Sequence, residues 1–154
     1  MSDYFKELRK YIGHSPIIIP HSAVILFNKD NKVLIEIRSD DGFYDFPGGG
    51  VDLNETVEEA AKRELFEETG LIADKLELFK VYSGPITYYK YANGDEIYGI
   101  DTIYICKEYH GELKPQKEEV TSLMFLNLDD LPNGKLSIRD KQIIKDLREN
   151  DHDK

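Results

Sequence analysis

Residues 49–71 read GGVDLNETVEEAAKRELFEETGL, and they contain the best-delimited element of the chain. From residue 57 to residue 69 the side chains favour helix. Thr56 and Glu59 have the spacing of a capping box, in which a hydroxyl and a carboxylate satisfy the first free N–H groups of a helix. Gly70 stands where a C-terminal cap needs a left-handed backbone. The sequence therefore predicts a helix over residues 57–69.

This predicted helix carries glutamates on the side that should be packed. At about 3.6 residues per turn, one face collects the apolar side chains of Val57, Ala60, Ala61 and Leu65. Glu64 lies in the middle of that face, Glu68 lies within it, and Glu67 borders it. Unpaired buried charge is costly, so the carboxylates need protonation, basic partners or a bound cation.

A divalent cation is our interpretation of this face. The chain has 20 basic residues against 30 acidic ones, so basic partners are scarce. Oxygen ligands favour hard ions such as Mg²⁺, Mn²⁺ or Ca²⁺, and the segment has no His or Cys that would favour zinc. We expect Mg²⁺, with Mn²⁺ as a substitute. The alternative is a solvated acidic stripe with Lys62 and Arg63 pairing at its edges, and helical geometry alone leaves the two open.

The composition excludes several classes of protein. A chain of 154 residues with 40% hydrophobic side chains is too apolar to be disordered and has the length of one domain. Its net charge of −10 disfavours binding to a nucleic acid polymer or to an anionic membrane surface. Cys106 is the only cysteine, so no internal disulfide can form and a cytoplasmic setting is expected.

Outside residues 57–69, the pattern predicts strands, turns and a second helix. The three glycines at 48–50 follow Pro47, and we expect neither helix nor regular strand there. Asn93-Gly94 predicts a hairpin turn, and Ser137 predicts the cap of a helix over residues 137–150. Strands are expected at 17–27 and 32–38, joined by a short hairpin loop, and at 76–83, 87–91, 96–106 and 123–128. These elements indicate an α+β domain with a mixed sheet covered by helices.

The stretch 49–71 resembles the signature of the Nudix hydrolases. That pattern is a glycine, five free positions, Glu, seven free positions, Arg-Glu, an apolar residue, a free position, Glu-Glu, a free position, Gly and an apolar residue. It is met by Gly49, Glu55, Arg63, Glu64, Leu65, Glu67, Glu68, Gly70 and Leu71. The segments RSDDGFYDFPGG at 38–49 and LNLDDLP at 126–132 are similar to the flanking segments of the family, with Tyr44 where many members carry tryptophan. Asn54 replaces a glycine common in the family.

The resemblance implies a Nudix fold over residues 1–154, an α/β/α sandwich with a mixed β-sheet, in a MutT-like or ADP-ribose pyrophosphatase-like enzyme. It implies Mg²⁺-dependent hydrolysis of a diphosphate bond in a nucleoside diphosphate linked to another moiety. ADP-ribose or a nucleotide sugar ranks first as substrate, a noncanonical nucleoside triphosphate second and a dinucleoside polyphosphate third. The alternatives are a non-catalytic nucleotide-binding sensor and an acidic surface that docks a basic partner. The resemblance is compatible with a homodimer.

Residue roles follow from the resemblance. It implies that Glu64 and Glu68, one helical turn apart, are the principal metal ligands and that Glu67 is a further ligand or a base. The carbonyl of Gly48 is expected as an additional ligand. Arg63 is expected to orient Glu67 or Glu55 through a charged hydrogen bond without touching the metal.

Other candidate residues lie outside the signature or brace it. Glu55 is expected to support the loop before the helix. Glu119 is expected as a metal ligand or general base from a later loop, Arg38 as a phosphate contact and Tyr44 as a base-stacking surface. The spacing of His14, His21 and His110 marks no catalytic partner.

Overall fold

A computed structural model describes residues 3–115 and 120–152 of the chain. Its helices are α1 (Asp3–Ile12), α2 (Val57–Thr69) and α3 (Ile138–His152), with short 3₁₀ turns at η1 (Gly84–Thr87), η2 (Leu128–Asp130) and η3 (Asn133–Lys135). Its strands are β1 (Ile17–Leu26), β2 (Val33–Arg38), β3 (Tyr44–Asp45), β4 (Gly48–Gly50), β5 (Leu71–Tyr82), β6 (Tyr88–Lys90), β7 (Glu96–Gly111) and β8 (Val120–Leu126). Among the described residues, no helix combines the length and the apolar character needed to cross a membrane.

The central sheet is mixed and has the strand order β4-β1-β7-β5, with β6 paired to β7. β1 runs parallel to β7, from Ile17 opposite Ile97 to Leu26 opposite Cys106. The other pairings in this sheet are antiparallel. β1 is buried on both faces over much of its length, as its apolar run predicts.

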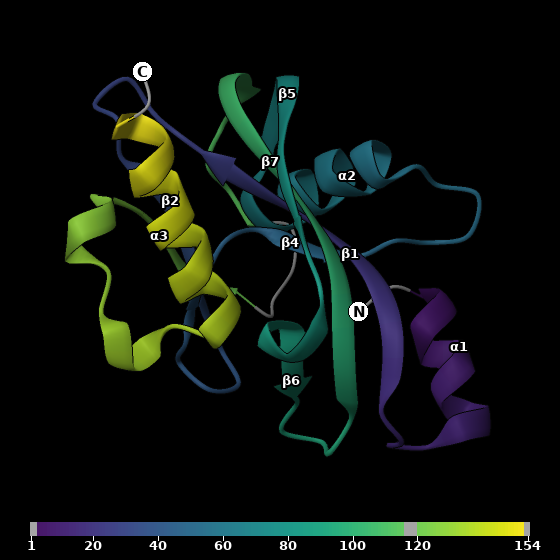
Figure 1. The fold of residues 1–154 in the computed structure, drawn as a ribbon. Helices are drawn as coiled ribbons and strands as arrows, with labels where there is room; N and C mark the ends of the chain where they lie inside the picture. The colour runs from purple at the N-terminus through teal and green to yellow at the C-terminus, as the bar shows by residue number, and fades with distance from the viewer. Residues whose placement is uncertain (1–2, 116–119, 153–154) are drawn as a thin grey trace.

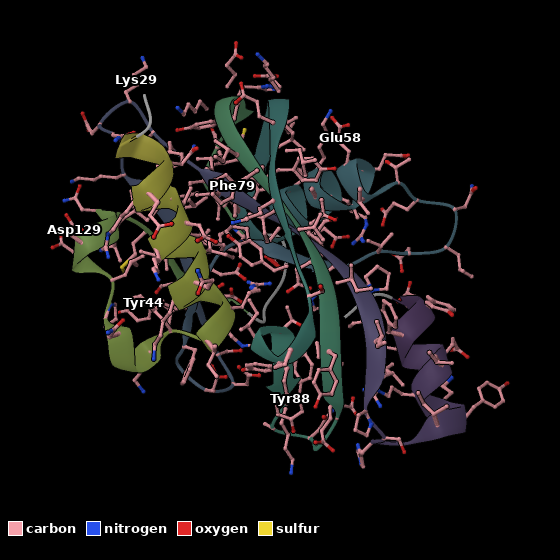
Figure 2. The ribbon with its side chains drawn as sticks, in the orientation of Figure 1. Lys29, Tyr44, Glu58, Phe79, Tyr88 and Asp129 are labelled. Atoms are coloured by element: carbon pink, nitrogen blue, oxygen red, sulfur yellow. The ribbon has the colours of Figure 1, made fainter. Side chains whose placement is uncertain are left out.

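The two faces of β1 belong to different hydrophobic clusters. Ala23 and Ile25 pack with side chains of α3, whereas Val24 and Leu26 pack with Ala61 and other side chains around α2. In Figure 1, α2 and α3 accordingly lie on opposite sides of the central sheet, and Figure 2 shows side chains filling both layers. This arrangement confirms the expected α+β architecture with a mixed sheet between helices.

The predicted hairpin between residues 17–27 and 32–38 forms only next to its turn. The Asn28 N–H donates to the carbonyl of Lys32, and Phe27 pairs with Val33. Beyond this bridge the strands separate, because both edges of β1 are occupied by β4 and β7. β2 instead forms a second, antiparallel sheet in the order β3-β2-β8. The strands were predicted correctly, but a hairpin pairing along their length was wrong.

The expectation that the glycines at 48–50 form no regular strand was also wrong. Gly48–Gly50 form β4 and pair with His21, Ser22 and Ala23 of β1. A Cβ on Gly49 would lie 2.6 Å from the carboxyl carbon of Glu64, so a side chain there would collide with α2. Glycine is therefore used here for close packing between a strand and a helix.

The N-terminal helix α1 had no counterpart in the sequence prediction. Its Phe5 is buried with Ile19 and Ile97, and this cluster fixes α1 against the ends of β1 and β7. Arg9 donates to the carbonyl of Glu96 at 2.7 Å and forms an ion pair with Asp95. The helix expected at residues 137–150 is observed as α3, and the Asp140 N–H donates to Ser137 Oγ at its start.

Candidate active site

Helix α2 holds two carboxylates inside the protein. Thr56 and Glu59 form the predicted capping box, and Gly70 closes the helix with a φ of 81°. With both ends fixed, Glu64 and Glu68 are directed inward and are only 2% and 9% exposed. The structure therefore contradicts a fully solvated acidic stripe at these two positions.

Arg63 holds several acidic side chains of the signature in place. Its Nε donates to Glu55 Oε2 at 2.6 Å, and its Nη1 donates to Glu64 Oε1 at 2.7 Å and to Glu67 Oε2 at 3.2 Å. Its Nη2 donates to the carbonyl of Gly50 at 2.9 Å, which ties α2 to β4. The hydrogen bond from Arg63 lowers the pKa of Glu55. This geometry is the one expected for an orienting arginine.

Glu68 shares its buried position with a carboxylate outside the signature. The Gly48 N–H donates to Glu68 Oε2 at 3.0 Å, so the observed contact of Gly48 with this carboxylate uses its N–H. Glu36 of β2 is 7% exposed and reaches the same place. Burial, followed by the charge and hydrogen bond of Glu36, raises the pKa of Glu68 well above its ordinary value.

Sequence reasoning missed Glu36. The signal that could have identified it is a single glutamate within VLIEIR, a strand otherwise rich in β-branched and aliphatic residues. A charged residue in such a strand is costly unless the fold gives it a partner or a role. Here the partner of Glu36 is Glu68, with which it shares a hydrogen bond.

The carboxylates have the chemistry of a divalent-cation site. Within residues 3–115 and 120–152, no three His, Cys, Asp or Glu side chains already form a ready-made metal cage. Glu64 is engaged by Arg63 and Glu68 by Gly48, so ligation requires side-chain rearrangement. Glu36 and Glu68 are both buried and repel each other when both are ionised. A cation that replaces the proton between them would remove this repulsion. The donor set, oxygen only, suits Mg²⁺ or Mn²⁺.

These carboxylates open into a cavity of about 560 Å³. Arg38, Tyr44, Gly48, Glu64 and Glu68 all contribute to its lining, so the fold brings five of the predicted residues together. The remaining predicted residues differ in position. Arg63 and Glu67 support the site from outside the cavity lining, and Glu119 lies outside the described residues.

Arg38 lines the cavity, and its guanidinium already has an acidic partner and two aromatic neighbours. It donates to Asp40 at 3.0 and 2.7 Å and lies over the rings of Tyr89 and Tyr91, 5.1 and 5.5 Å from their centroids. Burial raises the pKa of Tyr91 to about 12. Tyr89 also donates a hydrogen bond to Asp41, which joins the loop after β2 to β6. Arg38 and the two tyrosines form one cation–π cluster.

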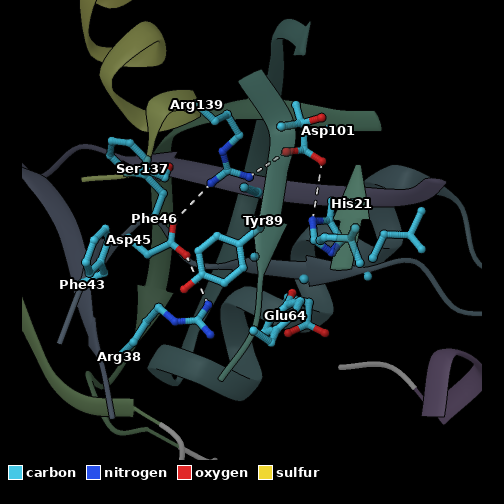
Figure 3. Close-up of a pocket in the computed structure, with 18 of the residues that line it drawn as sticks. His21, Arg38, Phe43, Asp45, Phe46, Glu64, Tyr89, Asp101, Ser137 and Arg139 are labelled. Atoms are coloured by element: carbon cyan, nitrogen blue, oxygen red, sulfur yellow. Dashed lines mark hydrogen bonds and ion pairs between the residues drawn. The ribbon is translucent and has the colours of Figure 1, made fainter. Parts of the chain in front are cut away.

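A second charged cluster lies across the cavity and was not predicted (Figure 3). Arg139 of α3 donates to Asp101 Oδ2 at 2.9 Å, to Asp45 Oδ1 at 3.2 Å and to Asp140 Oδ1 at 2.8 Å. His21 Nδ1 lies 3.5 Å from Asp101 Oδ1. Burial and then the charge of Asp140 raise the pKa of Asp45 well above its ordinary value.

The pKa of Asp101 is shifted in the opposite direction from that of Asp45. Burial by itself raises its pKa, but the nearby His21 and the charge of Arg139 outweigh this effect and leave the pKa below its ordinary value. Asp101 is therefore a buried anion fixed by two partners.

The comparison with known proteins defines the family. A model of the NUDIX domain matches residues 19–147. An ADP-ribose pyrophosphatase from Methanocaldococcus jannaschii is 35% identical over 144 residues, which cover 92% of this chain and 79% of that protein. The chain belongs to the Nudix family. The resemblance to MutT-like Nudix hydrolases and the expectation of a pyrophosphohydrolase enzyme are thereby confirmed.

Solved structures show the same Nudix fold. A MutT NUDIX hydrolase from Burkholderia pseudomallei superposes with a TM-score of 0.69 and 25% identity, covering 84% of this chain and 98% of that one. The NUDIX domain of Shewanella oneidensis NrtR, complexed with ADP ribose, has a TM-score of 0.68 and covers 97% of this chain and 99% of that one. At 20% identity, the second likeness shows the fold alone.

Proposed function

We propose that this Nudix hydrolase cleaves a diphosphate bond in a nucleoside diphosphate linked to another moiety, with Mg²⁺ or Mn²⁺ as cofactor. One observation carries the proposal: the buried Glu64 and Glu68 face a cavity of about 560 Å³ that Arg38 and Tyr44 also line. Cavities of roughly 300–1,000 Å³ are typical of small-molecule sites. In the reaction, water adds to one phosphorus, the bridging P–O bond breaks, and a nucleotide and the phosphorylated remainder are released.

ADP-ribose or a related nucleotide sugar is the proposed substrate class. The relative from M. jannaschii bears the name ADP-ribose pyrophosphatase, and the same fold holds ADP ribose in the S. oneidensis structure. A noncanonical nucleoside triphosphate ranks second and a dinucleoside polyphosphate third. A non-catalytic sensor is disfavoured, because a protein that only binds nucleotide has no need for buried carboxylates at Glu64 and Glu68.

The metal is proposed to be held by Glu64 and Glu68, with Glu67 and the Gly48 carbonyl as further ligands. When bound, a divalent ion neutralises phosphate charge and lowers the pKa of an attacking water. Arg63 keeps Glu64 and Glu67 in orientation through its hydrogen bonds. Glu119 remains proposed as a general base or ligand from the later loop.

The wider setting completes the proposal. Residues 1–154 would form a single Nudix domain with its signature at 49–71, acting on a small-molecule nucleotide in the cytoplasm. Its net charge of −10 gives no reason to propose a nucleic acid polymer or a membrane as partner. Tyr44 is proposed to stack on the base, Arg38 to approach a phosphate, and a homodimer is compatible with this scheme.

A nucleotide panel tests the proposal. ADP-ribose, nucleotide sugars, noncanonical triphosphates and dinucleoside polyphosphates are incubated with Mg²⁺, with Mn²⁺ or with EDTA, and products are separated by chromatography. We expect metal-dependent release of AMP and ribose phosphate from ADP-ribose. Glu58→Gln is the matched control for Glu68→Gln, because Glu58 is exposed on the same helix. Nucleotide binding without turnover under all metal conditions would instead establish a sensor.

A further inference from the structure

His21 occupies a central position between the candidate metal-binding residues and the second charged cluster. On β1 it pairs with Gly50 of β4 on one side and with Asp101 of β7 on the other. Its side chain is 16% exposed and lines the cavity, whereas the side chain of Asp101 is 3% exposed. In the view of Figure 3, Asp101 lies above the His21 ring and Glu64 lies below it.

Asp101 is built to hold the His21 ring in one orientation. Its Oδ2 accepts from Arg139 at 2.9 Å, and its Oδ1 lies 3.5 Å from His21 Nδ1. A Cβ on Gly99 would collide with the Asp101 carboxylate, so the strand leaves room for this side chain. Because the Asp101 carboxylate lies beside Nδ1, Nε2 is the ring nitrogen left for a ligand.

The cavity would hold an anion more tightly with a hydrogen-bond donor besides its arginines, which already have aspartate partners. Each arginine in its lining is paired with an aspartate: Arg9 with Asp95, Arg38 with Asp40, and Arg139 with Asp101. A diphosphate is anionic and is repelled by the carboxylates around it. When both nitrogens of the His21 ring carry a proton, Nε2 can donate its N–H to such a substrate while Nδ1 faces Asp101.

The position of His21 points to the diphosphate rather than to the far end of the substrate. Neighbouring strands lie about 4.8 Å apart, so His21 is one strand from β4. His21, Glu64 and Glu68 all line the same cavity, so the His21 ring shares this space with the carboxylates that would hold the metal. The scissile bond must lie beside these carboxylates if they act through a metal.

We propose that His21 is a substrate-binding residue that donates a hydrogen bond from Nε2 to a diphosphate oxygen, and that Asp101 is its positioning residue. This inference rests on the proposed function, because it assumes a diphosphate substrate beside Glu64 and Glu68. It adds to Arg38 a second anion contact outside the signature, and this contact comes from β1.

The test compares His21→Ala and His21→Gln with His110→Ala. His110 forms a similar pair with Asp74 at 2.8 Å, but on the exposed surface and away from the cavity lining. The KM and kcat for ADP-ribose are measured with Mg²⁺, and the Kd for ADP-ribose is measured by calorimetry in a Glu68→Gln background. Melting temperatures verify that each variant is folded.

A lost charged hydrogen bond should raise both KM and Kd about 10- to 100-fold in His21→Ala, with a much smaller change in kcat. His21→Gln, which retains an N–H donor, should recover part of the affinity, and Asp101→Asn should show a smaller rise in KM. His110→Ala should match the wild type. If His21→Ala has a lowered melting temperature, His21→Gln is used instead, provided that its melting temperature is normal. Its KM and Kd then decide whether His21 contacts the substrate.

The outcomes separate this inference from the proposed function. Wild-type hydrolysis with unchanged KM and Kd in His21→Ala overturns the inference and leaves the hydrolase intact. A fall in kcat at constant KM also overturns it. A wild type that binds but does not cleave, with binding lost in His21→Ala, refutes hydrolysis and supports the contact. A wild type that binds no nucleotide of the panel overturns both. If it binds a panel nucleotide other than ADP-ribose, KM and Kd are measured with that nucleotide and the same outcomes decide.

Discussion

Two walls of the cavity each depend on an arginine: Arg139 lines the cavity, whereas Arg63 supports the lining residue Glu64 from behind. The two clusters differ in where their parts come from. Arg63 engages Glu55, Glu64 and Glu67, all within one loop and helix of the signature. Arg139 engages Asp45, Asp101 and Asp140, which come from β3, β7 and α3. The first wall, which we call the helix wall, can be formed by local structure. The second, the composite wall, exists only after distant segments have packed.

The walls should also differ in what they contribute. The side chain of Arg63 is 26% exposed, whereas that of Arg139 is 14% exposed and joins three elements. Solvent can replace part of what Arg63 provides, but two partners of Arg139, Asp101 and Asp140, have side chains only 3% and 2% exposed. We therefore expect the helix wall to control turnover and the composite wall to control stability.

The largest expected effect is on turnover in the helix wall. Glu64→Gln or Glu68→Gln should lower kcat about 10²- to 10⁴-fold, because each removes a negatively charged ligand from the proposed metal site. Steady-state hydrolysis of ADP-ribose and a melting curve measure activity and folding together. Full activity in both variants would remove the ligand assignment, and Glu58→Gln serves as the control that keeps activity.

Loss of Arg139 should produce the largest change in stability. Arg139→Ala leaves buried carboxylates without their counter-charge, which should lower the free energy of unfolding by about 3–5 kcal/mol. Urea denaturation measures the change. A loss below about 1 kcal/mol would show that the composite wall is not held together by this arginine.

Arg63→Ala should affect activity more than stability, the opposite of Arg139→Ala. We expect kcat/KM to fall about 10- to 100-fold, because the orientation of Glu64 and Glu67 is lost. The free energy of unfolding should change by only about 1 kcal/mol, since these ion pairs are partly solvated. If instead the two arginine variants have the same ratio of activity loss to stability loss, the proposed division between the walls fails.

Two carboxyls, Glu68 of α2 and Asp101 of the composite wall, should change stability with pH in opposite directions. In the metal-free protein the pKa of Glu68 is raised by burial and by Glu36, so the folded state holds the proton more tightly than the unfolded chain. Stability should therefore fall as pH rises above about 4.3, the ordinary value for Glu, and the fall should continue until the folded pKa is passed. Glu68→Gln should flatten this decline when unfolding is measured in EDTA across neutral pH.

Asp101 gives the contrasting case. Its pKa is lowered because His21 and Arg139 outweigh the effect of burial. Its contribution to stability is present above about pH 3.9, the ordinary value for Asp, and is lost as pH falls through the lower, folded value. Asp101→Asn should remove part of the acid sensitivity in the same titration. A steeper acid transition in that variant would contradict this assignment.

The smallest effect concerns the start of the helix wall. Thr56 Oγ1 accepts from the Glu59 N–H at 3.0 Å, and Thr56→Ala should lower the free energy of unfolding by about 1 kcal/mol. KM should change little, because the capping residue does not line the cavity. Thermal unfolding and steady-state kinetics measure the two quantities, and a large rise in KM would show that the cap positions the site.

The difference between the walls also explains what the sequence could predict. The capping box, Gly70 and the spacing of Glu64 and Glu68 are local features, so α2 and the inward direction of its carboxylates were predicted from the residues. The Nudix fold followed from the same stretch through its resemblance to the family.

The composite wall depends on pairing that no local pattern specifies. His21 meets Asp101 only because β1 runs parallel to β7, and Arg139 reaches Asp101 from α3. Glu36 of β2 likewise meets Glu68 of α2 only in the folded protein, so its role could not be predicted from its own strand. The strand at Gly48–Gly50 was missed for a related reason: its glycines are favoured by the neighbouring helix and strand rather than by strand propensity.

The parallel pairing of β1 with β7 also bears on the order of folding. Contacts between segments far apart in the chain are slow to form, whereas a helix with its own caps forms quickly. During synthesis His21 emerges long before Asp101, and Arg139 emerges later still. Catalytic competence should therefore lag behind the recovery of helical signal when the denatured protein is returned to native buffer.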